Sequence, residues 1–146
     1  MRHLKTKILF ESREGKSFHD NLKNTLDYST DKNPIIEDIK DICLDVLDNG
    51  FFVEMYSQPL LDMEKVICLT MWKFPNMKPL TSREGVGNQL SFKYSDISED
   101  VERLKNYLGN KLIDVREWST SGYWVPLSLS SRGGSTITGL IITFKL

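Results

Sequence analysis

The residue types that carry most enzyme chemistry are few in this chain and poorly placed for it. Its two histidines, His3 and His19, both lie near the N-terminus and form no HxxxH pair. A catalytic triad or a zinc site needs such a side chain held rigidly beside its partners. The two cysteines, Cys43 and Cys68, lack CxxC spacing and are expected to be buried free thiols in a reducing compartment. We therefore expect no enzyme activity, no metal and no cofactor.

Two further patterns could bind ions, but each has a simpler interpretation. Asp38, Asp41 and Asp45 follow helical spacing and could loosely attract a divalent cation. A hard-cation site needs oxygen ligands that converge from several directions, so a solvated acidic helix face is the simpler interpretation. Segments 82–87 and 132–135 contain glycine and could offer backbone N–H groups to a phosphate. Both are interpreted as loop turns, because neither has the lysine and following helix of a P-loop.

Large aromatic side chains are the most informative candidate binding residues. Three expected strands, at residues 51–57, 65–74 and 111–119, alternate between an apolar set and a set with aromatic rings. The apolar set suits a core covered by helices and consists of Phe51, Val53, Met55, Ile67, Leu69, Met71, Ile113 and Val115. The second set is expected on the face without helices and includes Phe52, Tyr56, Trp72, Arg116 and Trp118.

This second set predicts a binding surface. Leaving a large apolar side chain in water forgoes about 1.5–3 kcal/mol relative to burial, so a contiguous patch normally contacts something. Aromatic and arginine side chains are typical anchors of protein interfaces. Three other residues extend the candidate surface: Leu44 on the outer side of the first helix, and Tyr123 and Trp124 in an expected irregular loop at residues 120–135.

Three alternatives remain for what covers this surface. The N-terminal residues and the loop at 120–135 could fold back over it. A protein partner or a second copy of the chain could cover it. Single-stranded nucleic acid could stack on it, but Glu54 and Asp114 lie beside Arg116 on this face, and the net charge is −1. Protein binding is therefore the leading function, and single-stranded nucleic-acid binding is the alternative.

The elements that must position these residues begin with a well-marked helix at residues 33–49. Asn33 can cap its first turn, and Pro34 suits its first helical position. Asn49 and Gly50 can end it. Its apolar stripe consists of Ile35, Ile36, Ile39, Ile42, Cys43, Val46 and Leu47.

A second helix is expected at residues 95–108, where Asp96 and Glu99 resemble a capping box. Each helix is followed by glycine and then by strands, and residues 36–39 (IEDI) are similar to residues 98–101 (SEDV). The pattern predicts two αββ units, either duplicated or convergent, with an extra strand before the second. The expected fold is an α+β two-layer sandwich of order αββ-β-αββ, with an antiparallel sheet of four to five strands and two helices on one face.

The length of 146 residues suits one domain, expected at residues 33–146 behind an N-terminal arm at residues 1–32. The arm is basic, but it also holds apolar groups such as Phe10 and Leu22, so we expect it to dock on its own sheet or on a neighbouring chain. Neither a membrane-spanning apolar run nor a signal-peptide core is visible, so a cytoplasmic protein without membrane contact is expected.

Four segments carry a resemblance to a known group of proteins: MRHLK at residues 1–5, FES at 10–12, NGF at 49–51 and FKYSDI at 92–97. Their layout is similar to that of small uncharacterised proteins of large tailed bacteriophages. The resemblance implies a viral accessory or structural protein and implies no activity and no site. Together with the aromatic set, it predicts a phage-type protein that acts by protein–protein contact through the open sheet face and the arm.

Overall fold

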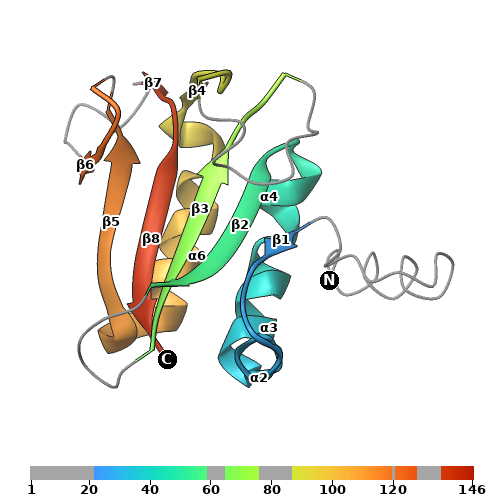
Figure 1. Ribbon diagram of the computed structural model, residues 1–146. Coiled ribbons are helices and arrows are strands. Elements are labelled where there is room, and N and C mark those ends of the chain that lie inside the picture. The colour runs from blue at the N-terminus through green and yellow to red at the C-terminus, as the bar shows by residue number, and fades with distance from the viewer. Residues whose placement is uncertain (1–21, 59–64, 76–86, 120, 128–135) are drawn as a thin grey trace, which may run out of the picture.

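A six-stranded sheet covered on one face by helices forms the fold (Figure 1). The computed structural model describes residues 22–58, 65–75, 87–119, 121–127 and 136–146. Residues 1–21 of the expected arm, most of the 82–87 segment and all of the 132–135 segment lie outside the described residues.

The strands follow the order β1-β2-β3-β8-β5-β6, and each neighbouring pair is antiparallel except β1–β2. Their bounds are β1 Lys23–Asn24, β2 Phe52–Gln58, β3 Val66–Trp72, β5 Leu112–Trp118, β6 Trp124–Pro126 and β8 Leu140–Lys145. A second, two-stranded sheet pairs β4 Phe92–Lys93 with β7 Thr136–Ile137. The predicted α+β sandwich is confirmed, with six strands instead of four to five. The added strands β1 and β6 are too short for period-two alternation to reveal.

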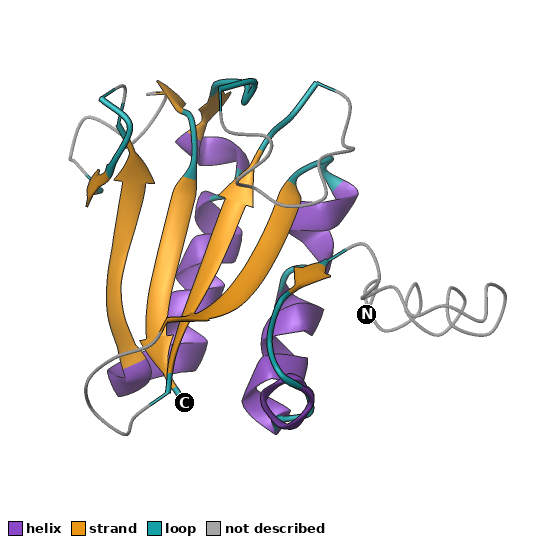
Figure 2. Ribbon diagram, viewed as in Figure 1, coloured by secondary structure: helices purple, strands orange, loops and turns teal. Residues whose placement is uncertain are grey.

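The helices are α2 Tyr28–Asp31, α3 Pro34–Ile42, α4 Leu44–Asp48 and α6 Ser98–Leu108, and the three longer ones lie on one face of the sheet (Figure 2). The Asn33 side chain accepts a hydrogen bond from the N–H of Ile35 at 2.9 Å, which confirms the predicted cap of α3. The cap predicted for α6 is wrong. Asp96 lies in a 3₁₀ turn, η2 Tyr94–Asp96, and no side chain caps α6.

The single helix predicted at residues 33–49 is broken at Cys43, which ends α3 and precedes α4. A projection at 100° per residue does not carry across such a junction. Leu44, expected on the outer side, is therefore buried with 1% of its surface exposed. Ile42, expected in the core stripe, is only half-buried.

The main core lies between the helices and the covered face of the sheet. Its helical side includes Ile36, Ile39, Val46, Val101, Leu104 and Leu108. Its sheet side includes Val53, Met55, Ile67, Leu69, Met71, Leu140, Ile142 and Phe144. Leu22 is the first residue that the structure describes within the expected arm, and it belongs to the same core. Directly after it, β1 joins the sheet beside β2.

The prediction that Ile113 faces this core is wrong. Leu112 pairs with Phe144 and Asp114 with Thr143, so β5 holds one residue more than β8 at this point. Such a β-bulge changes which residues of a strand face each side. Leu112 packs against the core, whereas Ile113 is 44% exposed.

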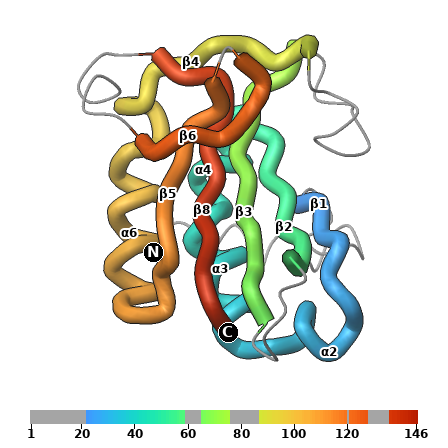
Figure 3. Tube along the Cα trace, turned by 60° about the vertical axis from the view of Figure 1, so that its left-hand side comes forward, coloured from blue at the N-terminus to red at the C-terminus, as the bar shows by residue number. Residues whose placement is uncertain are grey.

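The two predicted αββ units meet at the middle of the sheet. The first contributes β2 and β3 after α3 and α4, and the second contributes β5 and β8 after α6, with the short strands β6 and β7 between them in the chain. Figure 3 shows β3 and β8 side by side, with β5 and α6 beyond β8 and with β2 beyond β3. The start of β3, the end of β8 and the start of β5 consequently lie at the same end of the sheet.

Candidate functional site

Five aromatic rings gather on the sheet face opposite the helices and form what we call the open-face aromatic cluster. Its members are Phe52, Trp72, Phe74, Trp118 and Trp124. The ring centroids of Trp72 lie 5.6 Å from Trp118 and 5.3 Å from Trp124. Trp118 and Trp124 meet edge to face at 4.9 Å. These are favourable aromatic geometries, so the rings stabilise one another.

The cluster is a second core rather than the exposed patch that the sequence predicts. Only 3% of the surface of Phe52 and 2% of that of Trp72 is exposed. Trp118 and Trp124 are half-buried. The predicted irregular loop at 120–135 contains β6, which pairs antiparallel with β5 and places Trp124 opposite Trp118. Within the described part of the two central strands, β3 and β8, no aromatic ring is exposed for base stacking.

Gly139 makes room for the Trp72 ring. A Cβ atom at position 139 would lie 2.6 Å from Cζ3 of Trp72. The carbonyl of Gly139 also accepts a hydrogen bond from the N–H of Trp118 at 3.0 Å. Gly139 therefore contacts both the Trp72 ring of β3 and the backbone of β5.

Gly139→Ala is expected to lower the free energy of unfolding by about 1–3 kcal/mol, because the added Cβ would force the buried Trp72 ring to shift. Urea unfolding followed by far-ultraviolet circular dichroism measures the change. Gly122→Ala is not a suitable control, since Gly122 has a φ of 87° that disfavours alanine. Ser121→Ala, in the exposed turn, is the control. An unchanged midpoint for Gly139→Ala would contradict the close packing.

A hollow of about 580 Å³ opens on the same face beside the aromatic cluster, and we call it the open-face hollow. It is lined by residues of five strands, among them Tyr56, Cys68, Ile113, Asp114, Arg116 and Thr143. The bulge in β5 brings Ile113 into it, next to the exposed guanidinium of Arg116. Sequence reasoning missed Ile113 because regular alternation assigned it to the core.

The polar groups described in the open-face hollow include two neutral groups and one ion pair. Burial raises the pKa of the Cys68 thiol and that of the Tyr56 phenol, so both keep their protons at neutral pH. Cys68 donates to Oε1 of Gln58 at 3.2 Å. Nε of Arg116 donates to Oδ2 of Asp114 at 3.0 Å, whereas Oδ1 of Asp114 is buried without a hydrogen-bond partner. The hollow combines an ion pair, neutral hydroxyl and thiol groups, and one exposed aliphatic side chain.

Two carboxylates of the first helical segment, Asp38 and Asp45, contact α6. Arg103 of α6 pairs with Asp45 at 2.9 Å and, within α6, also with Asp100. The Tyr107 hydroxyl donates to Asp38 at 2.6 Å. Within the described ranges, no group of three or more His, Cys, Asp or Glu residues could hold a metal ion.

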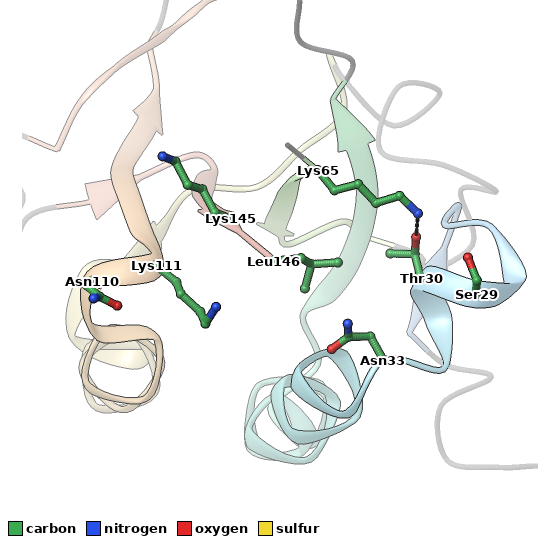
Figure 4. Close-up of a pocket in the computed structure, with 8 residues that line it drawn as sticks. All are labelled: Ser29, Thr30, Asn33, Lys65, Asn110, Lys111, Lys145 and Leu146. Atoms are coloured by element: carbon green, nitrogen blue, oxygen red, sulfur yellow. Dashed lines mark hydrogen bonds between the residues drawn. The ribbon is translucent and has the colours of Figure 1, made fainter. Parts of the chain in front are cut away.

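A second cavity, of about 650 Å³, lies at the end of the sheet where β3 and β5 begin and β8 ends. We call it the lysine cleft (Figure 4), and its lining consists of Ser29, Thr30, Asn33, Lys65, Asn110, Lys111, Lys145 and Leu146. Nζ of Lys65 donates to Oγ1 of Thr30 at 2.6 Å and pairs with Asp27 at 3.3 Å. None of its three lysines stands out in the sequence, because each lies at the end of a different strand.

The predicted site residues differ in exposure and in position, and Trp124 belongs both to the aromatic cluster and to the lining of the open-face hollow. Phe52, Trp72 and Leu44 are buried and are not available as a surface. Trp118 and Trp124 are half-buried in the aromatic cluster, and Tyr123 is 58% exposed on the turn before β6. Only Tyr56, Arg116 and Trp124 line the open-face hollow.

Comparisons of the chain with protein-family models, with curated proteins and with solved structures give no match. Among the helices that the structure describes, none has the length and apolar character needed to cross a membrane.

Proposed function

We propose that this chain is a small non-enzymatic binding protein that holds a segment of a partner protein in the open-face hollow. The observation that carries the proposal is the β-bulge in β5, which turns Ile113 out of the core and into the hollow. Bulges are common where a strand must re-aim a side chain for a functional contact. Here the bulge leaves the Ile113 side chain 44% exposed, and burying an exposed aliphatic group against a partner is favourable.

The chemistry of the open-face hollow supports a protein partner. Ile113 offers an apolar contact, while Arg116 and Tyr56 are of the residue types enriched at the energetic centres of interfaces. The hollow also contains neutral hydrogen-bonding groups from Cys68 and Thr143. A partner segment that presents an apolar side chain beside a carbonyl or carboxylate acceptor fits this lining.

The nucleic-acid alternative has less support. Base stacking needs exposed rings on the sheet, but Phe52 and Trp72 are buried in the aromatic cluster. Asp114 also lies in the hollow and would repel a phosphate backbone. The resemblance in layout to small phage proteins also supports a role as an accessory or structural protein of a bacteriophage, acting in the host cytoplasm.

Site-specific photo-crosslinking tests this function. A photoreactive phenylalanine derivative at position 113 is expected to give a discrete adduct in extracts of the native cells, and unlabelled chain should compete with it. Arg116→Glu should weaken formation of the adduct about tenfold, because it reverses the charge of an interface anchor. Mass spectrometry of the adduct then distinguishes a foreign partner from a second copy of the chain.

The matched control places the same photoreactive residue at position 105, on α6 and thus on the covered side of the sheet. If position 105 gives the same adduct, or if position 113 gives none, the open-face hollow is not a protein-binding site. An adduct with nucleic acid at position 113 would instead favour the alternative function.

A further inference from the structure

The lysine cleft is produced by the topology of the sheet. Lys65 immediately precedes β3, Lys145 is the last residue of β8, and Lys111 immediately precedes β5. The order β3-β8-β5 makes these three strands neighbours, and their antiparallel pairing brings the three positions to one end of the sheet. Three lysines that are far apart in sequence thereby line one cavity (Figure 4).

Thr30, on another side of the cleft, fixes the position of the Lys65 amine. Thr30 is a polar residue with only 2% of its surface exposed, and its Oγ1 accepts a hydrogen bond from Nζ of Lys65 at 2.6 Å. Lys111 has no ion-pair partner among the described residues. Figure 4 shows its amine pointing toward the middle of the cavity, between Asn110 and Asn33, while the Lys145 amine points away from it.

The described residues that line the lysine cleft are rich in donors, and none of them has a carboxylate side chain. The eight described lining residues comprise three lysines, two asparagines, two hydroxyl residues and Leu146. An ammonium group with three N–H donors is a point charge that suits anions with several oxygens. We propose that the lysine cleft binds a compact, multiply charged phosphate anion, of the kind found in pyrophosphate or in the phosphates of a nucleotide.

The surroundings of the cleft favour a compact anion over an extended one. Asp27 lies 3.3 Å from Lys65 at one side, and Asp31 and Glu37 belong to the adjacent turns of α2 and α3. A nucleic-acid backbone that left the cleft on that side would pass all three carboxylates, of which Asp27 pairs with Lys65 of the cleft, whereas Asp31 and Glu37 pair with Lys40. The volume of about 650 Å³ accommodates a nucleotide-sized ligand. This site is independent of the open-face hollow, which lies on a sheet face and not at the end of the sheet.

Isothermal titration calorimetry of the full chain with pyrophosphate at low ionic strength tests the proposal. We expect saturable binding of one pyrophosphate per chain. Lys111→Gln should weaken this binding about tenfold, because it replaces the charged donor with a neutral one on a slightly shorter side chain. Lys93→Gln is the matched control, since Lys93 is exposed and lies in β4, at the other end of the molecule (Figure 1).

Four results would overturn the proposal. Pyrophosphate binding that does not saturate at millimolar concentrations shows that the lysine cleft is not a phosphate site. If Lys111→Gln and Lys93→Gln weaken pyrophosphate binding equally, the binding depends only on the net charge of the protein. Adenosine that binds as well as adenosine triphosphate shows that phosphate is not what is recognised. A single-stranded oligonucleotide that binds more tightly than pyrophosphate and loses affinity with Lys111→Gln shows that the cleft serves nucleic acid.

Discussion

Trp72→Ala is expected to lower the free energy of unfolding by about 3–5 kcal/mol, the range for removing a large buried aromatic side chain. Trp72 is 2% exposed and has Trp118, Trp124 and Phe74 as ring neighbours. Its loss would leave a cavity and would expose the rings packed on it. Urea unfolding should be followed by far-ultraviolet circular dichroism, because the substitution alters the tryptophan fluorescence itself.

Tyr123→Ala provides the control for this variant. Tyr123 is 58% exposed on the turn that leads into β6, so its removal should change the stability by no more than about 0.5 kcal/mol. A Trp72→Ala variant that is as stable as Tyr123→Ala would show that the aromatic cluster is a surface and not a second core. The original prediction of an exposed binding patch would then be restored.

Ile39→Ala is expected to cost about 2–5 kcal/mol, through lost burial and through the cavity left between α3 and the sheet. Ile39 is 0% exposed and belongs to the main core. The measurement is the same urea titration, and the slope with denaturant should not change if unfolding remains two-state.

Ile42→Ala is a control of the same residue type in the same helix. Ile42 is half-buried at the last position of α3, so its truncation should cost less than Ile39→Ala, below about 2 kcal/mol. Equal losses for the two variants would mean that α3 and α4 present one continuous apolar face. The junction at Cys43 would then not redirect the side chains.

The aromatic cluster packs part of the sheet face opposite the helices, which moves the candidate binding surface away from the aromatic rings. The rings predicted for recognition stabilise the fold, and the open-face hollow beside them holds the exposed groups. Arg116 and Tyr56 remain candidates from the sequence, but Ile113 replaces Phe52 and Trp72 as the apolar contact. A partner that binds there would approach the same face of the sheet without displacing the aromatic cluster.

The sequence by itself determined the features that depend on near neighbours in the chain. The cap at Asn33 and the apolar stripe around Ile39 predicted the start and the buried face of the first helix, because helical contacts join residues three or four apart. Alternation in residues 51–57 and 65–74 placed Val53 and Leu69 on the core side. Two helices, each followed by strands, were enough to predict the α+β class.

Only the tertiary structure decided the features that depend on residues distant in sequence. The bulge at Ile113 depends on the register of β5 against β8. The burial of Trp72 depends on the space left by Gly139 and on the pairing of β6 with β5, which packs Trp124 against the Trp72 ring. The lysine cleft exists only because three strands from different parts of the chain end at one place. Period and propensity describe each strand separately, whereas register, close approach and convergence are set by pairing between strands, and both candidate sites arise from that pairing.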